Sequence, residues 1–239
     1  MSRLFEELDH ADTPIGPLSL RRRRELRLGV DAVEIQLGEE FLMTSLFTAS
    51  EVALGRLGIG ALNGDGLEVV VGGLGLGYTA QAVLESEAVR ELIVVEYLAP
   101  VIRWHAQGLL PMGRALVEDP RCRLVEDDFF AMAAEAGFDP DAPLRRFDAL
   151  LIDIDHTPER LLDDRSDAFY RPEGLRAAAR HLRPGGVFGL WSNDPPDPRF
   201  LDRLSSAFAA ARAEPVAFHN PLTDRPFTQT VYLAHTAVD

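Results

Sequence analysis

The chain has 239 residues, of which 46% are hydrophobic and 26% are charged, so it has enough apolar side chains to bury the core of a large domain. All 24 basic residues are arginine, and 38 acidic residues bring the net charge to −14, which argues against a protein that coats nucleic acid. The absence of lysine excludes mechanisms that need a lysine amine, such as Schiff-base and P-loop chemistry.

The single cysteine, Cys122, cannot form an intramolecular disulfide or, alone, a thiolate-rich metal site. No stretch approaches the ~20 apolar residues that a membrane helix needs. The first residues carry charges of both signs in place of the apolar core of a secretory signal. We therefore expect a cytoplasmic protein that binds neither membranes nor nucleic acid.

Residues 1–60 are predicted to form a small β-rich region and a linking helix. Leu18–Leu28 and Ala32–Leu37 alternate apolar and polar residues around a turn at residues 29–31, which is typical of a hairpin. Phe41–Leu57 is predicted to be the linking helix. Its apolar face could dock internally, which is the default, or form a homodimer contact.

Residues 61–239 are predicted to form the main domain, because strands alternate with helices as they do around a parallel sheet covered on both faces. The chain is expected to end in antiparallel strands. The predicted strands are Leu67–Gly73, Leu92–Glu96, Arg121–Val125, Phe147–Asp153 and Val187–Trp191, and the predicted helices are Tyr78–Glu87, Pro100–Leu109, Pro172–Leu182 and Pro198–Arg212.

Ligands of such sheets bind beyond the carboxyl ends of the strands, so the residues that follow each strand are the candidate site. A glycine-rich loop follows the first predicted strand, where it lets the backbone approach a ligand and leads into a helix N-terminus. Its glycines are Gly72, Gly73, Gly75 and Gly77. Glu96 closes the second strand, at a spacing from the loop that suits an acid accepting hydrogen bonds from ribose hydroxyls. Together these features predict a cofactor that contains adenosine.

Acidic residues also follow the third and fourth predicted strands. Asp127 and Asp128 could receive the exocyclic amine of adenine, although capping the next helix is nearly as good an explanation. Asp153, Asp155 and His156 crowd titratable groups into one small site, where carboxylates raise one another's pKa and bind cations. A solvated loop at the strand end is the alternative.

Five segments, taken in order, resemble the spermidine synthase (polyamine aminopropyltransferase) family and, more widely, the class I S-adenosylmethionine-dependent methyltransferases. The segments are VVVGGLGLGYT, LIVVEY, RLVEDDFF, FDALLIDIDHTP and FYRPEGLRAAARHLRPGGVFGLW. The resemblance implies a Rossmann-like α/β fold of the class I methyltransferase type, with a mostly parallel sheet and a small β-rich N-terminal region.

The resemblance also implies residue roles. It assigns cofactor binding to Gly72, Gly73, Gly75, Gly77, Glu96, Tyr97 and one or both of Asp127 and Asp128. It implies that Asp153 deprotonates the attacking amine, with Asp155 and His156 binding the substrate. The cofactor would be S-adenosylmethionine or its decarboxylated form, with no metal.

Three parts of the sequence depart from the family pattern. The family has a polar segment rich in Gln and Tyr before the first helix of the main domain, and Phe41 to Ser45 replace it here. Spermidine synthases carry an acid in the glycine loop, facing the amine of the decarboxylated cofactor, and Gly75 stands there instead. Their D-S-x-D-P motif reads Asp153 to Thr157 here, so that His156 takes the place of the second acid. The residues expected to bind the nucleotide therefore match the family pattern better than those expected to bind the polyamine.

We expect an aminopropyltransferase that uses decarboxylated S-adenosylmethionine and an amine acceptor. Methyl transfer from S-adenosylmethionine to a small molecule and a non-catalytic protein that binds an adenosyl cofactor are the alternatives. A divalent metal held between Asp153 or Asp155 and Asn193 or Asp194 is a weaker variant of the methyltransferase hypothesis.

Overall fold

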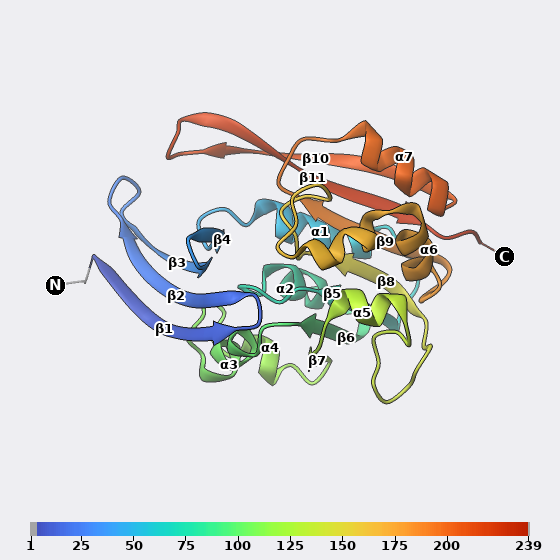
Figure 1. The fold of residues 1–239 in the computed structure, drawn as a ribbon, viewed down its shortest axis with the longest axis horizontal. Helices are drawn as coiled ribbons and strands as arrows, with labels where there is room; N and C mark the ends of the chain where they lie inside the picture. The colour runs from blue at the N-terminus through green and yellow to red at the C-terminus, as the bar shows by residue number, and fades with distance from the viewer. Residues whose placement is uncertain (1–3, 239) are drawn as a thin grey trace.

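A computed structural model describes residues 4–238 and contains two β-sheets (Figure 1). The N-terminal sheet is antiparallel and four-stranded, in the order β1(Phe5–Thr13), β2(Gly16–Glu25), β3(Val30–Leu37) and β4(Glu40–Thr44). One face of its central strands is apolar, with Leu18, Leu20 and Ile35 buried. These side chains belong to the same apolar core as the larger sheet, so the N-terminal sheet packs onto the rest of the chain.

The larger sheet has seven strands in the order β10-β11-β9-β8-β5-β6-β7. The parallel strands are β5(Leu67–Gly72), β6(Val89–Glu96), β7(Cys122–Glu126), β8(Phe147–Ile152) and β9(Leu182–Ser192), and the antiparallel pair is β10(Ala210–Asn220) and β11(Arg225–His235). The strand order runs outward from β5 in both directions. The carboxyl ends of β5, β6 and β8 therefore meet at a topological switch point, and the predicted Rossmann-like fold is confirmed.

Helices cover both faces of this sheet. Val69 and Val71 of β5 face one core, which α1(Ala49–Gly60), α2(Tyr78–Leu84), α3(Ala99–Gln107) and α4(Ala115–Glu118) cover. Val70, between them, faces the opposite core, which is covered by α5(Phe129–Ala134), the 3-10 helix η1(Asp164–Tyr170), α6(Pro172–Ala179) and α7(Pro198–Ala207). This alternation explains why the central strands are continuous apolar runs.

Two sequence-based predictions of local structure are wrong. The linking helix begins at Ala49, whereas residues 40–44 form β4, which pairs with β3 after a tight turn at Gly38. Strand β9 begins at Leu182 and not at Val187 as predicted, because residues 183–186 form a bulge inside it, where Leu182 pairs with Phe147 and Val187 pairs with Ala149. In both places pairing with a neighbouring strand decides the structure.

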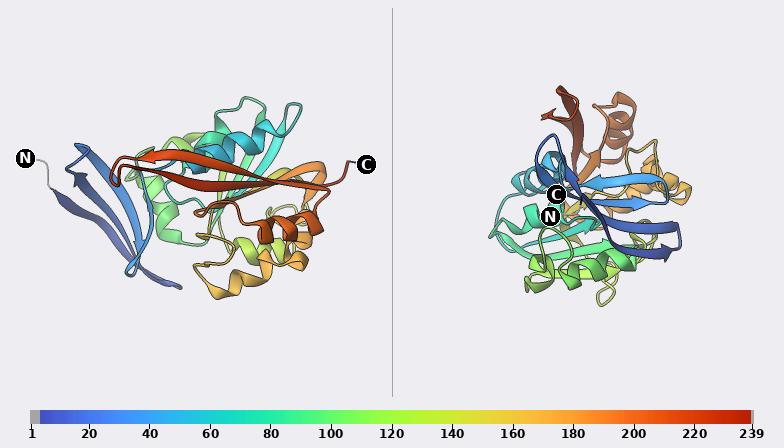
Figure 2. Two further views of the ribbon diagram at one scale, coloured as in Figure 1. Left: turned by 90° about the horizontal axis from the view of Figure 1, so that it is seen from above. Right: turned by 90° about the vertical axis from the view of Figure 1, so that its left-hand side faces the viewer.

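The β10–β11 hairpin extends past the edge of the larger sheet. Thr230–His235 of β11 pair with β9, whereas Arg225–Gln229 pair with β10 alone. This outer half of the hairpin, which we call the hairpin arm (residues 216–229), reaches toward the N-terminal sheet (Figure 2). Arg27, in the turn between β2 and β3, donates a hydrogen bond to the carbonyl oxygen of Leu222 at the tip of the arm.

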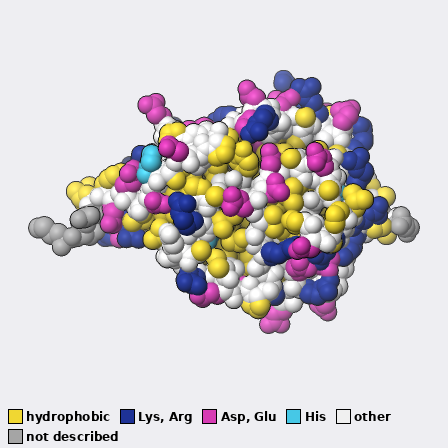
Figure 3. All heavy atoms as spheres, turned by 60° about the horizontal axis from the view of Figure 1, so that its bottom comes forward, with side chains coloured by type: hydrophobic (Ala, Val, Ile, Leu, Met, Phe, Trp, Pro, Cys, Tyr) yellow, Lys and Arg dark blue, Asp and Glu magenta, His cyan; other side chains and the backbone are white. Residues whose placement is uncertain are grey.

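The face shown in Figure 3 mixes acidic and arginine side chains, with hydrophobic side chains between them. The net negative charge therefore forms no continuous acidic patch on that face. Within residues 4–238, no helix is both long and apolar enough to span a membrane.

Candidate functional site

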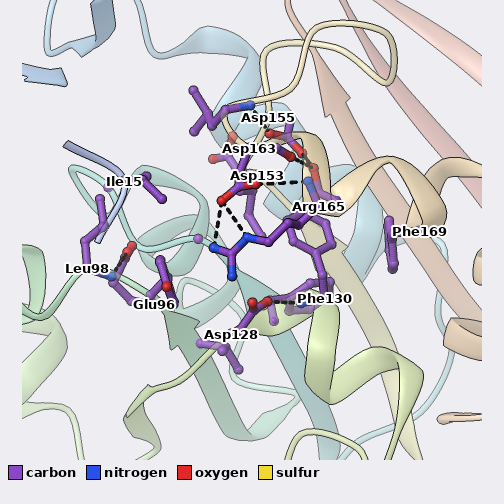
Figure 4. A pocket seen from close by; sticks show the side chains of 18 of the residues that line it. Ile15, Glu96, Leu98, Asp128, Phe130, Asp153, Asp155, Asp163, Arg165 and Phe169 are labelled. Atoms are coloured by element: carbon purple, nitrogen blue, oxygen red, sulfur yellow. Dashed lines mark hydrogen bonds and ion pairs between the residues drawn. The ribbon is translucent and has the colours of Figure 1, made fainter. Parts of the chain in front are cut away.

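A cavity of about 470 Å³ lies at the carboxyl ends of β5, β6 and β8. A volume of this size is typical of small-molecule sites. Its acidic lining residues are Glu51, Glu96, Asp128, Asp153, Asp155 and Asp163, and Arg165 extends from η1 toward the same space (Figure 4). Because acids outnumber bases in the lining, the cavity favours a ligand that carries positive charge.

Glu96 is buried at the end of β6 and holds two loops together. One carboxylate oxygen accepts a hydrogen bond from the backbone N–H of Leu74 at 2.9 Å, and the other accepts one from Leu98 at 2.7 Å. Burial raises the pKa of Glu96, and the backbone donors oppose this effect. The backbone N–H groups of Gly75 and Tyr97 contribute to this opposing effect. Two oxygens offer about four acceptor positions, so ligand hydroxyl groups would share the Glu96 carboxylate with these backbone donors. The adjacent Tyr97 lines the cavity, with the Arg165 guanidinium carbon 6.0 Å from its ring centroid.

Two of the four loop glycines, Gly73 and Gly75, line the cavity. Gly73 has φ +89° and approaches β8 so closely that a Cβ there would collide with the carbonyl oxygen of Asp153. Gly75 has φ +46°, and a Cβ there would lie 2.6 Å from the sulfur of Met43. These glycines are therefore required by chain packing as well as by any ligand.

The other two loop glycines lie against neighbouring side chains. A Cβ at Gly72 would lie 2.6 Å from the ring of Phe129, and one at Gly77 would lie 2.7 Å from Leu116 and 2.9 Å from His105. Gly77 has φ +91° and precedes α2. Their sequence-based assignment to cofactor binding stays a prediction.

Asp128 caps α5 and also lines the cavity. Its Oδ1 accepts hydrogen bonds from the backbone N–H groups of Phe130, at 2.9 Å, and Ala131, at 3.2 Å. Asp127 is exposed, and its Oδ1 accepts from the backbone of Asp128. Helix capping therefore accounts for one oxygen of Asp128, and its second oxygen remains available to a ligand.

Asp153 and Glu51 form a pair of carboxylates in the cavity. Asp153 Oδ2 accepts a hydrogen bond from the Thr79 hydroxyl at 2.6 Å. Burial raises the pKa of Asp153 to about 6. Burial, together with the negative charge of Asp153, raises the pKa of Glu51 to about 7. Two buried carboxylates near each other resist simultaneous ionisation, and a bound cation relieves that repulsion.

Glu51 was missed by the sequence-based prediction, although its spacing carries a signal. It lies three, four and seven residues before Leu54, Gly55 and Gly58, all of which are buried on the same face of α1. An acid on the buried face of an apolar helix is unusual and indicates either a partner or a function.

A hydrogen-bond network holds Glu51 in place. The Ser50 hydroxyl lies 2.8 Å from Glu51 Oε2 and 2.7 Å from Gln229 Oε1. It also accepts a hydrogen bond from Trp191 Nε1 at 2.8 Å. The Gln229 amide nitrogen in turn donates to Asn193 at 3.0 Å. Helix α1, the end of β9 and the last residue of the hairpin arm are thereby joined beside the carboxylate pair.

Asp155 and His156 follow Asp153 but make different contacts. Asp155 is 4% exposed and accepts hydrogen bonds from the Leu162 backbone at 2.6 Å, the Tyr170 hydroxyl at 2.7 Å and the Ser166 hydroxyl at 3.1 Å. Asp155 therefore holds the loop after β8 against the cavity. His156 Nε2 lies 3.0 Å from Glu40 Oε1 of β4.

Both residues line the cavity, and their assignment to substrate binding stays a prediction. Within residues 4–238, no cluster of three or more His, Cys, Asp or Glu side chains is placed to hold a metal ion.

Comparison with known proteins shows a likeness in fold. No family model matches the sequence. The chain is similar to the crystal structure of spermidine synthase from Thermotoga maritima, with a TM-score of 0.72 and 18% sequence identity over 98% of this chain and 73% of that one. A spermidine synthase in complex with the transition-state analogue AdoDATO gives the same values. The chain therefore has a spermidine synthase-like fold of the class I methyltransferase type, with the β-rich N-terminal region included.

Proposed function

We propose that this protein is a transferase that moves an aminopropyl group from decarboxylated S-adenosylmethionine to an amine acceptor. The observation that carries the proposal is the Asp153–Glu51 carboxylate pair, which lies in the same acid-lined cavity as Glu96. The likeness in fold to spermidine synthases supports it.

The residues around the cavity suit an adenosyl sulfonium compound. Such a compound, when bound, supplies an electrophilic carbon beside a positively charged sulfur. Glu96 would accept hydrogen bonds from its ribose hydroxyls, and Asp128 would receive the adenine amine. The acidic lining offsets the sulfonium charge.

Asp153 would act as the base. An amine acceptor is protonated at neutral pH and cannot attack carbon until it loses a proton. With a pKa of about 6, Asp153 is ionised at neutral pH and accepts that proton. The free amine then forms an N–C bond to the carbon beside the sulfonium, while the C–S bond breaks and its electron pair stays on sulfur. Glu51 supplies a second carboxylate that attracts the acceptor's ammonium group before proton transfer.

Methyl transfer from intact S-adenosylmethionine is a second candidate, and one observation favours it. The resemblance implies an acid at the position of Gly75, facing the amine of the decarboxylated cofactor. Here the Met43 sulfur occupies the space beside Gly75. The glycine loop therefore offers no carboxylate to that amine.

Parallel calorimetric titrations with S-adenosylmethionine, its decarboxylated form and methylthioadenosine test the proposal. We expect the decarboxylated form to bind at least tenfold more tightly than the intact one, or about 1.4 kcal/mol. Asp153→Asn should abolish transfer to amines while affinity for methylthioadenosine is kept. Asp141→Asn, at an exposed acid that does not line the cavity, is the matched control.

Tighter binding of the intact compound with a methylated product would favour the second candidate. Tight binding without transfer to any amine or hydroxyl compound would indicate a non-catalytic binding protein.

A further inference from the structure

A second cavity, of about 310 Å³, adjoins the first one. The residues that line both are Leu42, Met43, Glu51, His156 and Trp191. The second cavity lies between β4 with the segment after it, the end of β9 and the hairpin arm. A molecule held there would present its reactive end to the carboxylate pair, which is where an acceptor must lie under the proposed function.

Aromatic side chains form much of the lining. They are Phe41, Phe47, Trp191, Phe218 and Phe227. The rings of Phe47 and Phe218 are stacked with centroids 6.0 Å apart, and those of Phe218 and Phe227 are 5.7 Å apart. Phe227 is 39% exposed, because the hairpin arm lies beyond the core of the larger sheet. These rings form an apolar wall that a ligand could cover.

The charges in the second cavity do not suit a diamine. Among the described residues that line it, Glu51 is the one acid, and it lies at the junction with the first cavity. The remaining polar groups include the neutral amides of Asn193, Asn220 and Gln229, together with the cationic Arg160. A linear diamine bound by one end at Glu51 would extend its second ammonium group toward these residues, among which there is no further acid. The nearby carboxylate of Glu40 is already paired with His156 at 3.0 Å. Aromatic faces attract cations, but Arg160 already places a positive charge in the same lining.

We propose that the second cavity selects an acceptor with a single amine and an aromatic body, and discriminates against linear diamines. This inference rests on the proposed function. The amine would lie between Glu51 and Asp153, and the aromatic body would cover the rings of Phe47, Phe218 and Phe227. Burying an aromatic group against other rings is favourable, whereas burying an unpaired ammonium group is not.

The test compares 2-phenylethylamine with butane-1,4-diamine. Binding of each amine is measured by calorimetry, with and without methylthioadenosine, and transfer is measured with decarboxylated S-adenosylmethionine. We expect 2-phenylethylamine to bind at least tenfold more tightly than the diamine. The binding measurement does not require turnover, so it tests the cavity separately from the reaction.

Two variants probe the lining itself. Phe218→Leu keeps an apolar side chain but removes a ring, and should weaken 2-phenylethylamine binding about fivefold without changing affinity for methylthioadenosine. Phe5→Leu, at an exposed ring that lines neither cavity, is the control. Asn220→Asp should raise diamine affinity roughly threefold by supplying a carboxylate. It keeps the oxygen that accepts hydrogen bonds from Leu222 and Thr223 in the turn. Melting temperatures establish that each variant is folded.

The outcomes separate the two proposals. Equal or tighter binding of the diamine, or no binding of either amine, would overturn the inference about the second cavity. Transfer to the diamine would at the same time support the proposed reaction. Preferential binding of 2-phenylethylamine without transfer to any amine would support the cavity's selectivity and overturn the proposed reaction.

Discussion

Replacing Glu51 by Gln should stabilise the protein, and the gain should grow with pH. Glu51 is 7% exposed, and its pKa rises from 4.5 to about 7 on folding. The folded state therefore retains the Glu51 proton at pH values where the unfolded chain has lost it. The stability that this proton contributes is fully present below the unfolded pKa and is lost as pH rises through the folded pKa. Gln cannot ionise, so the Glu51→Gln variant does not lose this stability as pH rises.

The size of the effect follows from the pKa values. Each pKa unit corresponds to about 1.36 kcal/mol, so the Glu51 carboxylate reduces the free energy of unfolding by about 3 kcal/mol once pH exceeds 7. About 2 kcal/mol of this should develop between about pH 5.5 and about pH 8. Gln also keeps an oxygen that can accept from the Ser50 hydroxyl, which lies 2.8 Å from Glu51 Oε2. The expected gain is therefore electrostatic.

Urea unfolding of the native chain and of Glu51→Gln at about pH 5.5 and about pH 8 measures the difference in their free energies of unfolding. The comparison requires that this free energy falls with urea concentration at the same slope in the two proteins. Glu85→Gln is the control, because Glu85 is exposed and its hydrogen bonds with Arg56 lower its pKa. That variant should not gain stability as pH rises. A Glu51→Gln protein whose stability relative to the native chain is the same at both pH values would refute the view that Glu51 is buried beside a second carboxylate.

Three further substitutions test the geometry around the carboxylate pair. Glu96→Gln should weaken methylthioadenosine binding by about tenfold in calorimetry, because an amide is a weaker acceptor than a carboxylate for both backbone and ribose donors. Unchanged affinity would contradict the proposal that Glu96 binds the ribose. Gly73→Ala should lower the free energy of unfolding by about 2 kcal/mol or more, because a Cβ would collide with the Asp153 carbonyl oxygen and φ at this position is positive. An unchanged free energy of unfolding in urea would contradict the close approach of Gly73 to Asp153. Tyr170→Phe should lower the free energy of unfolding by about 1–2 kcal/mol, because the buried Asp155 carboxylate loses a hydrogen-bond donor. A loss near zero would show that this hydrogen bond is not formed.

The main features of the larger sheet could be predicted because the apolar pattern of each strand in the sequence agrees with the burial of that strand in the fold. Strands such as Leu67–Gly72 and Phe147–Ile152 are buried on both faces, so they are continuous apolar runs with polar residues at their ends. The expectation that Glu96 and Asp153 come together needed only the rule that parallel strands end at the same edge.

The N-terminal region and the hairpin arm could not be predicted as well, because their structure depends on pairing. Residues 41–44 are apolar enough for a buried helix, and the turn at Gly38 makes them a strand instead. The hairpin was expected as an antiparallel finish, but its alternating pattern does not show that Arg225–Gln229 lack a second partner strand. The second cavity depends on both of these elements, so no sequence pattern indicated it.

Asp153 and Asp155 show why a cluster of acidic residues in a sequence does not reveal the role of each residue. Both follow β8 at an interval of two residues, and their pattern in the sequence does not separate them. Only the family resemblance assigned Asp153 as the base and Asp155 to substrate binding. In the structure Asp155 accepts hydrogen bonds from three donors, one in the loop after β8 and two in η1, so its carboxylate already serves to hold these segments in place. Asp153 has a single side-chain donor, Thr79, and shares the cavity with Glu51. A carboxylate that is to accept a proton must not be fully satisfied by fixed donors, because each donor stabilises its ionised form and lowers its basicity. The difference in donors therefore favours Asp153 as the base and Asp155 as the residue that keeps the loop closed over it.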